Sequence, residues 1–324
     1  MKNIDDLQAL IDEEIRRQYR ILEPRELYEP MWYALSNGGK RLRPVFVLMG
    51  CQLFSDDIRR AALPALGIEM FHNFTLLHDD IMDKAFMRRN LPTVHVKWDV
   101  NRAILSGDAL AIQSNIFIAS CDKEILPDVL RVFNTTALQV CEGQQYDLNF
   151  ERIEEVSVTE YLNMIRLKTA VLIAGSLEIG SLIGGAAPQW AKRVYDLGDM
   201  IGMAFQLQDD FLDTFGNPET FGKNIGGDIL ANKKTFLLIK ARELADTEQL
   251  NLLKHYYSSE DFNAEEKIGS VKKIFRDLEI DKMTVEKVHE YSNKALSILA
   301  EIPVDGLRKV ELEKFTRNLM DRIR

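Results

Sequence analysis

Two short aspartate clusters are the residues of this sequence best suited to chemistry. One is DDIMD at residues 79–83, and the other is DDFLD at residues 209–213. On a helix, the first and last aspartates of such a cluster lie one turn apart on the same face, so several carboxylates crowd together. Hard divalent cations such as Mg²⁺ take all-oxygen ligands and commonly bridge carboxylates to phosphate oxygens. The spacing therefore indicates a metal-assisted reaction on a diphosphate.

A solvated acidic face is the ordinary explanation for one such cluster. Both clusters, however, interrupt strongly apolar runs, MFHNFTLLHDDIMDKAF and MIGMAFQLQDDFLDTF, so their helices should be largely buried. Because a buried, uncompensated carboxylate is costly, a cationic partner is expected beside each cluster. Two such clusters on separate helices favour metal binding over surface charge.

Basic residues near the clusters could hold anionic groups. In NGGKRLRP at residues 37–44, two glycines precede the bases, which lets the backbone approach an anion, and arginine can grip phosphate with two donors. A turn followed by a basic helix start explains this segment equally well, and it does not match the P-loop pattern. The bases that follow the two clusters are Arg88 and Arg89 after the first, and Lys223, Lys233 and Lys234 after the second.

Further polar residues lie in apolar surroundings. Lys168 and Thr169 stand inside YLNMIRLKTAVLIAG, where a lone lysine is normally costly, although its amine could reach solvent from a helix edge. His72 lies seven residues before Asp79, hence two turns back on the same face, and could donate a hydrogen bond to a diphosphate. A structural role in the core is the ordinary alternative for this histidine.

Long helices are predicted to position these residues. Alternating strand-like runs are scarce, and no segment changes to a Ser/Gly/Pro-rich linker composition. We therefore expect one all-α domain over residues 1–324, a large orthogonal or antiparallel helical bundle around a central cavity, with helices of about 20 residues or more. The helical spacing of apolar residues is clearest around residues 61–86, 104–122, 128–148, 158–184 and 190–215.

The composition excludes several classes of protein. With 46% apolar and 28% charged residues, the 324-residue chain is ordinary for a globular protein, and its net charge of -9 disfavours nucleic acid as a partner. Cys51, Cys121 and Cys141 form no CxxC pair, which argues for reduced thiols rather than disulfides or zinc. No apolar run is long enough to span a membrane, and the charged N-terminus lacks a signal-peptide core. We expect a cytoplasmic protein.

Taken together, these motifs resemble the trans-isoprenyl diphosphate synthase (polyprenyl synthetase) family. The resemblance implies the isoprenoid synthase fold, usually as a homodimer, and a transferase of isoprenoid biosynthesis. Such an enzyme condenses isopentenyl diphosphate head-to-tail with dimethylallyl, geranyl or farnesyl diphosphate and releases diphosphate. The motifs match in order from about residue 35 to 235, and they are GGKRLRP, DDIMD with its two arginines, GDAL at 107–110, GQQYDL at 143–148, Lys168-Thr169, and FQLQDDFLD with its lysines.

The resemblance also assigns catalytic roles. It implies three Mg²⁺ ions bound with the diphosphate, for which Mn²⁺ could substitute. These ions would pull the diphosphate from the allylic carbon. Asp80, Asp210 and Asp213 would orient metal waters and neighbouring cations. The metal ligands would be Asp79, Asp83 and Asp209, which together with Lys168, Thr169 and Gln206 make up the catalytic set.

Substrate-binding roles follow from the same resemblance. The departed diphosphate would act as the base, which accounts for the lack of an obvious protein base. The allylic diphosphate would be held by Lys168, Lys223, Lys233 and Arg88, and isopentenyl diphosphate by Lys40, Arg43, His72 and Arg89, with Phe205 near its double bond.

Residues before the first cluster bear on product length. Phe74 and Thr75 lie about 6 to 7.5 Å below Asp79 by helical rise and should line the cavity floor, although core packing is an alternative for Phe74. In the resembled family an aromatic residue here implies a product of fifteen or twenty carbons. Twenty is favoured, because Thr75 is not the second aromatic of animal farnesyl synthases and DDIMD lacks the insertion of the bacterial type.

Two alternative functions are weighed against this prediction. A terpene cyclase shares the helical fold, but its second metal site normally follows an Asn/Ser/Glu pattern rather than DDFLD. A noncatalytic subunit of a heteromeric prenyl synthase usually lacks one of the two aspartate clusters. Both clusters and their lysines are intact in this chain.

Overall fold

The computed structural model describes residues 1–217, 225–258 and 263–321, and helices dominate this part of the chain. The one strand pair among these residues is a small antiparallel hairpin of β1 (Met87–Arg88) and β2 (Leu91–Pro92). The prediction of an all-α fold is confirmed. None of the described helices combines the length and the apolar character that crossing a membrane requires.

Contacts between Cα atoms group the chain into two compact units, each built from segments that are far apart in sequence. One unit contains Met1–Ala137, Gly175–Tyr195 and Ile302–Leu312, and the other contains the remaining segments. The first aspartate cluster and NGGKRLRP belong to the former, whereas the second cluster and Lys168 belong to the latter. The prediction that residues 1–324 form a single domain stays a prediction.

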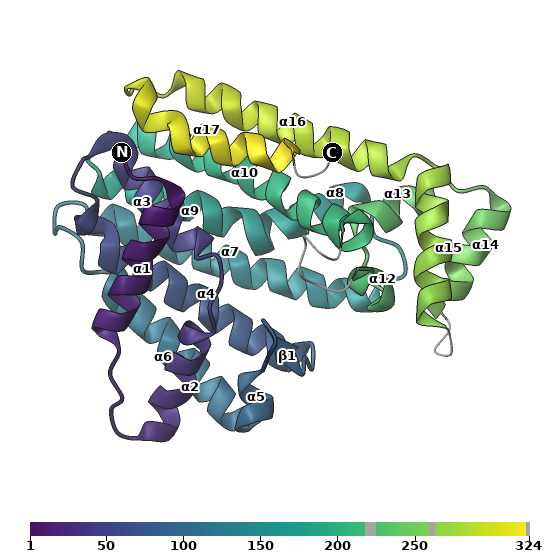
Figure 1. Ribbon diagram of the computed structural model, residues 1–324, viewed down its shortest axis with the longest axis horizontal. Coiled ribbons are helices and arrows are strands. Elements are labelled where there is room, and N and C mark those ends of the chain that lie inside the picture. Colours follow the sequence, from purple (N-terminus) through teal and green to yellow (C-terminus); the bar gives the residue numbers. More distant parts are fainter. Residues whose placement is uncertain (218–224, 259–262, 322–324) are drawn as a thin grey trace. The chain divides into compact units, whose positions relative to one another are not determined.

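The first unit is organised around α4 (Ala62–Met82), which packs against α6 (Val100–Ile118) (Figure 1). Most of the first half of α4 is buried, as expected for a helix with apolar residues on every side. Around α4 lie α1 (Ile4–Gln18), α2 (Arg25–Ser36), α3 (Leu42–Phe54), the 3₁₀ turn η1 (Ile58–Ala61) and α5 (Val94–Lys97).

The chain leaves α4 through a tight hairpin. Asp83 caps the C-terminus of α4, and Lys84 follows in the left-handed region with φ 52°. Between β1 and β2, Arg89 and Asn90 also have positive φ values, 52° and 62°, as the two central residues of a type I′ turn require. This turn fixes the directions of the two arginines that follow the first cluster.

The long helices of the sequence prediction are present. α7 spans Leu126–Arg152 and α10 spans Pro188–Phe215, with 27 and 28 residues. The stretch predicted around 158–184 is α8 (Val158–Ile165) and α9 (Val171–Ile183), joined by a five-residue π-helical turn, η2 (Arg166–Ala170). Ser157 starts α8 in a capping box with Glu160, an arrangement that stabilises a helix by about 1 kcal/mol.

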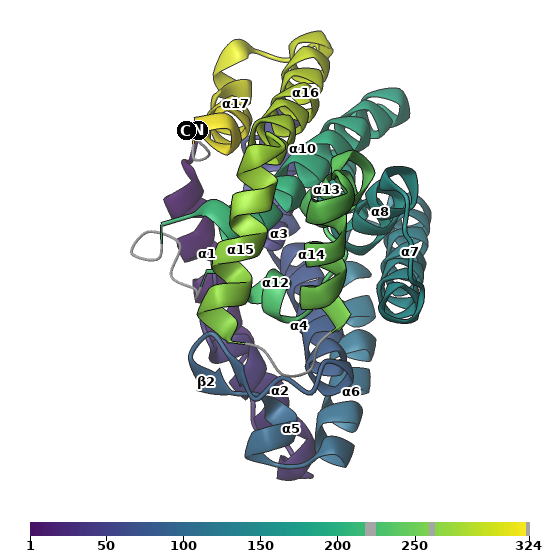
Figure 2. The same ribbon diagram turned by 90° about the vertical axis from the view of Figure 1, so that its right-hand side faces the viewer.

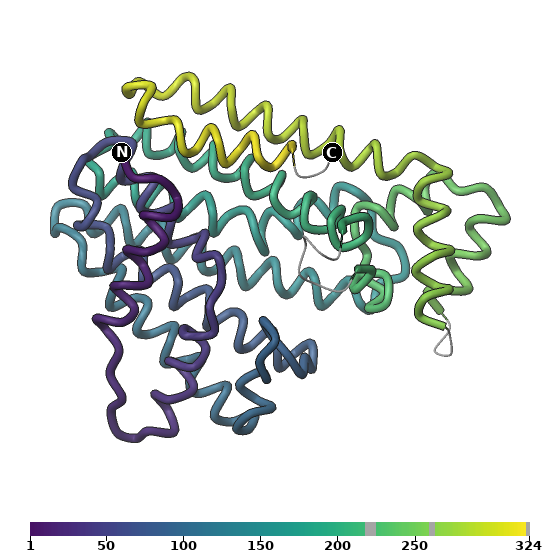
Figure 3. Tube along the Cα trace, viewed as in Figure 1, coloured from purple at the N-terminus to yellow at the C-terminus, as the bar shows by residue number. Residues whose placement is uncertain are grey.

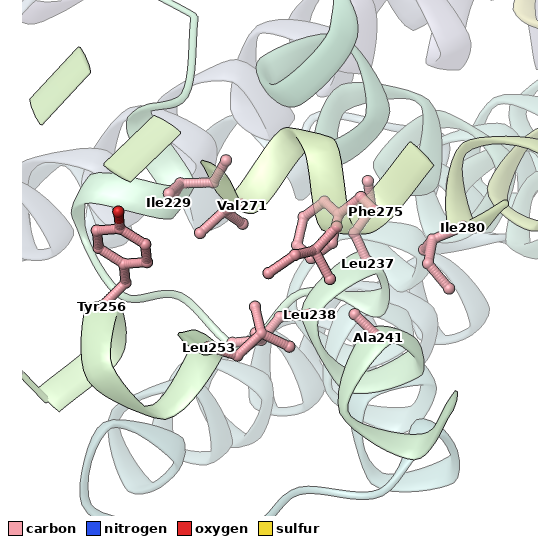
Figure 4. Packing of buried hydrophobic residues seen from close by; sticks show 10 residues of the cluster. Ile229, Leu237, Leu238, Ala241, Leu253, Tyr256, Val271, Phe275 and Ile280 are labelled. Atoms are coloured by element: carbon pink, nitrogen blue, oxygen red, sulfur yellow. The ribbon is translucent and has the colours of Figure 1, made fainter. Parts of the chain in front are cut away.

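Later helices of the second unit enclose a core of their own. Figure 3 follows the chain through α12 (Gly227–Leu230), α13 (Phe236–Leu244), α14 (Thr247–Ser258), α15 (Ala264–Asp277) and α16 (Ile280–Glu301). The last helix, α17 (Gly306–Asp321), belongs to the first unit up to Leu312 and to the second from Glu313 onward. Figure 2 shows α14 and α15 side by side. Leu237, Leu253, Val271 and Phe275 meet in the apolar cluster between these helices (Figure 4).

Candidate active site

The first aspartate cluster lies at the C-terminal end of α4. Asp79 is half-buried, Asp80 is buried, and Asp83 is exposed at the C-cap. The backbone amide of Asp83 donates to the carbonyl of Asp79 at 2.8 Å, so these two aspartates lie one turn apart, as the spacing predicts. Two carboxylates supplemented by diphosphate oxygens form a donor set that suits Mg²⁺. Within the described residues, no three Asp, Glu, His or Cys side chains are grouped closely enough to hold a metal ion alone.

Asp80 binds an arginine of the hairpin. The Nε of Arg88 donates to both carboxylate oxygens of Asp80, at 2.8 and 3.0 Å, and Nη2 lies 2.7 Å from Oδ1. Burial raises the pKa of the Asp80 carboxyl, an effect that the hydrogen bonds from Arg88 oppose. Asp80 therefore anchors a neighbouring cation, as predicted. The role of Arg88 on the allylic diphosphate stays a prediction.

Arg41 in NGGKRLRP is a structural residue. It adopts φ 46° at the N-cap of α3, and its guanidinium is buried. It donates to Glu69 at 2.7 Å, to Asp12 at 3.3 Å and to the carbonyl of Leu35. Arg41 is therefore held by protein groups, whereas the substrate contacts predicted for Lys40 and Arg43 stay predictions.

Arg89 lies against the glycines of the same segment. It donates to the carbonyl of Gly38, and a Cβ placed on Gly39 would come within 2.7 Å of Arg89 Cζ. Gly39 therefore makes room for the arginine. A small pocket beside it is lined in part by Asn37, Asn73, Asp80, Arg88 and Arg89.

His72 contacts Arg43, with 3.1 Å between Nε2 and the guanidinium Nη1. Because a guanidinium can only donate, Nε2 must accept, which leaves the imidazole neutral with its proton on Nδ1. Burial, and then the positive charges of Arg43 and Arg89, lower the pKa of His72 well below its ordinary value. A hydrogen bond from His72 to a diphosphate would therefore come from Nδ1.

The second aspartate cluster lies near the C-terminal end of α10 and is held by a chain of hydrogen bonds. Buried Asp210 accepts from the Tyr161 hydroxyl and, at 2.9 Å, from Nε2 of Gln206. Thr169 in turn donates to Oε1 of Gln206 at 2.9 Å. Burial raises the pKa of Asp210 well above its ordinary value. The structure thus brings together Thr169 and Gln206, two residues of the predicted catalytic set, whose catalytic roles stay predictions.

Lys168 lies in the π-helical turn η2, a type of helix distortion that is frequent at functional sites. Its ammonium donates to Asp147 of the GQQYDL motif at 2.5 Å. A Cβ on Gly143 of the same motif would be 2.2 Å from the backbone nitrogen of Lys168, so a glycine is required for α7 to approach this closely. Both motif residues therefore serve the position of Lys168.

Two adjacent lysines after the second cluster have different surroundings. The Nζ of Lys233 lies 3.8 Å from a carboxylate oxygen of Asp228, whose backbone amide donates to Asp213 at 2.9 Å. Asp213 therefore supports the turn that leads to Lys233. Lys234 instead donates to the carbonyl of Phe150 at the end of α7. Lys223 lies outside the described residues.

Sequence reasoning missed two partners of the site residues, Tyr161 and Asp147. Tyr161 lies seven residues before Lys168 in the same apolar stretch, the spacing that singled out His72 before Asp79. Asp147 lies within a motif that was recognised but given no role. Phe205, predicted to lie near isopentenyl diphosphate, is partly buried on α10. The sharing of metal ions by the two clusters stays a prediction.

Comparisons with known proteins identify similar chains. Residues 24–278 match the polyprenyl synthetase family. The geranylgeranyl diphosphate synthase of Methanosarcina mazei is 37% identical over 235 residues, which cover 72% of each chain. The geranylfarnesyl diphosphate synthase of Aeropyrum pernix is 32% identical over 97% of this chain and all of its own.

Solved structures extend the likeness to the whole fold. The crystal structure of a geranylgeranyl pyrophosphate synthase superimposes with a TM-score of 0.95 at 42% identity, covering 99% of both chains. The geranylgeranyl pyrophosphate synthetase of Pyrococcus horikoshii gives 0.91 at 32% identity and covers 98% of both. The predicted isoprenoid synthase fold is confirmed.

Proposed function

The chain belongs to the polyprenyl synthetase family and is a short-chain prenyltransferase, and on this premise we propose that it condenses isopentenyl diphosphate with allylic diphosphates to make geranylgeranyl diphosphate. The observation that carries the proposal is the second cluster, where Asp210, Gln206 and Thr169 form one hydrogen-bonded chain. A terpene cyclase would not need DDFLD at its second metal site. A noncatalytic subunit would not need to keep this hydrogen-bonded chain of side chains. Several relatives are geranylgeranyl diphosphate synthases, which supports a twenty-carbon product.

Asp79, Asp83 and Asp209 would hold Mg²⁺ ions with the allylic diphosphate. The ions supply Lewis acidity that neutralises charge on the departing diphosphate. Among the described residues, Lys168 and Lys233 bring positive charge to the same anion, and each already lies beside an acidic side chain that orients it. Arg88 and Lys223 complete the proposed set.

The allylic cation needs dipoles that are already oriented when charge develops. Gln206 meets this requirement, because its amide nitrogen is fixed on Asp210 while its oxygen accepts from Thr169. The amide oxygen keeps a second lone pair, which we assign to the cation. Thr169 and Asp210 are buried, so they would help to keep water away from the cation.

Isopentenyl diphosphate is assigned to Lys40, Arg43, His72 and Arg89, with Phe205 at its double bond. A neutral His72 suits this role, because it donates from Nδ1 while its Nε2 accepts from Arg43. After bond formation, the departed diphosphate takes the proton.

We also propose a homodimer. On α6, Leu105, Ile112 and Ile116 are 60%, 64% and 56% exposed, and their spacing of seven and four residues puts them on one face. An apolar stripe of this kind marks an interaction surface, and a two-fold dimer would bury it against its own copy. Sedimentation of the Ile112→Lys variant should show dissociation, and an unchanged dimer would exclude this face.

The absence of disulfides among Cys51, Cys121 and Cys141 supports a cytoplasmic location.

The proposal is tested by incubating the protein with Mg²⁺, labelled isopentenyl diphosphate and farnesyl diphosphate. We expect labelled geranylgeranyl diphosphate from the native chain and a loss of at least about a hundredfold in kcat for Asp209→Asn. Asp128→Asn, at an exposed position of α7, is the matched control and should retain activity. Product formation without isopentenyl diphosphate would indicate a cyclase instead. Full turnover by Asp209→Asn would show that the metal assignment is wrong.

A further inference from the structure

The GDAL motif and His78 have no role in the function proposed above, yet the structure places them together. His78 immediately precedes Asp79 on α4, and its imidazole lies against α6. Its Nε2 is 3.2 Å from the carbonyl of Ile104 and 3.8 Å from a carboxylate oxygen of Asp108. The ring is therefore held from the neighbouring helix.

Gly107 supplies the space for this ring. A Cβ on Gly107 would lie 2.4 Å from Nε2 and 2.7 Å from Cδ2 of His78, far inside any normal contact. Any other residue at position 107 would push the imidazole away from α6. The glycine and the aspartate of GDAL thus contact the same side chain from one helix.

The imidazole also packs against Phe74, the residue expected at the cavity floor. The two rings meet edge to face, with centroids 4.8 Å apart at 70°. On its other side Phe74 contacts Phe71 at 5.6 Å, and Phe71 contacts Phe133 edge to face at 5.5 Å. Phe71 and Phe133 are 4% and 1% exposed, so this row of rings ends in the core.

Phe74 is therefore confined between two rings that differ in their support. Phe71 is fixed by the core, whereas His78 is fixed by α6 through the Ile104 carbonyl and by the absence of a side chain on Gly107. A prenyl chain that grows toward Phe74 would therefore meet a ring whose position depends on both His78 and Phe71.

We propose that product length is set by the row His78, Phe74 and Phe71 rather than by Phe74 alone, with His78 as a positioning residue and Gly107 as a specificity-determining residue. This inference rests on the proposed function, since it concerns where chain growth stops.

The first test is the product distribution of His78 variants, measured by chromatography after incubation with isopentenyl diphosphate and each allylic primer. We expect both His78→Ala and Phe74→Ala to shift the main product beyond twenty carbons, and the double variant to show no further shift. His78→Gln keeps a donor for the Ile104 carbonyl but has no ring, and it should behave as His78→Ala does. If both His78 variants keep the native product distribution, the inference is wrong.

Gly107→Ala tests the contact with His78 from α6 and should shorten the product rather than lengthen it. The added methyl group drives the imidazole against Phe74, so the fifteen-carbon fraction should rise. Gly269→Ala, where a Cβ would meet nothing within 4 Å, is the matched glycine control and should leave product length unchanged. Should Gly107→Ala fail to fold, the double variant His78→Ala/Gly107→Ala removes the clashing ring and should give the products of His78→Ala.

The outcomes separate the inference from the proposed function. Condensation by every variant with unchanged product lengths would overturn the role of His78 and Gly107 while the prenyltransferase assignment stands. A native chain that forms no prenyl diphosphate under these conditions would overturn the assignment itself. A product shift in Gly107→Ala that persists when His78 is also replaced would show that Gly107 does not act through His78.

Discussion

Replacing Glu69 by glutamine should destabilise the protein far more than its small change in shape suggests. Glu69 and Arg41 form an ion pair 2.7 Å long, with side chains only 2% and 5% exposed. Glutamine keeps the volume and an acceptor oxygen but removes the negative charge. The guanidinium is then left with the carbonyl of Leu35 and with Asp12, whose side chain is 43% exposed and 3.3 Å away.

The expected cost follows from the burial of the pair. Removing one partner of a buried ion pair costs about 3–5 kcal/mol, because the other charge stays desolvated. Since Asp12 and the Leu35 carbonyl still contact Arg41, we expect the lower limit, about 3 kcal/mol. With an unfolding entropy of about 2.1 cal/mol/K per residue and 324 residues, this lowers Tm by about 4 °C.

The measurements are thermal and urea unfolding at a fixed protein concentration, together with the KM for isopentenyl diphosphate. Arg41 caps α3 directly after Lys40, so we expect this KM to rise as the segment shifts. Glu313→Gln breaks the exposed pair with Arg317, at 45% and 56% exposure, and should cost less than about 1 kcal/mol. Equal losses in the two variants would refute the argument from burial.

Three further predictions concern single groups. Burial and the nearby arginines lower the pKa of His72 below 6.5, so at acidic pH the unfolded chain binds a proton that the folded chain does not. The free energy of unfolding should therefore fall as the pH drops below about 6.5. In urea titrations from pH 5 to 8, His72→Gln should make the free energy of unfolding depend less on pH. Tyr161→Phe removes the hydroxyl that orients Asp210 and should lower kcat by about 10–100-fold with little change in the KM for isopentenyl diphosphate; a native kcat would exclude the positioning role. Burial raises the pKa of Cys51 to about 12, so at pH 8 a thiol reagent should modify Cys51 only when the protein unfolds. Exposed Cys141 should react quickly in the folded protein, and Cys141→Ser should remove this fast phase of the modification.

Several features could be predicted from sequence because their causes are local. The one-turn spacing of Asp79 and Asp83 follows from helix geometry, and the helices themselves follow from apolar residues at three- and four-residue spacing. Catalytic roles for Thr169 and Gln206 were expected only through family resemblance, and the hydrogen bond of 2.9 Å between their side chains was not predicted.

Only the tertiary structure distinguished neighbouring bases of the same type. Arg41 is buried against Glu69, whereas Arg43 contacts His72. In the hairpin, Arg88 binds Asp80, whereas Arg89 donates to the carbonyl of Gly38. Likewise Lys233 lies near Asp228 while Lys234 donates to Phe150. A sequence shows that each base is charged, but its function depends on the desolvation and partners that distant segments supply.

The two aspartate clusters show the same division between local and distant causes. Their spacing, together with the apolar runs around them, indicated metal chemistry. The structure decided that Asp80 holds Arg88, that Asp210 holds Tyr161 from 49 positions away, and that Asp213 supports the turn before Lys233. Spacing along a helix determines which carboxylates share a face, whereas the packing of other helices determines which of them are taken by protein partners.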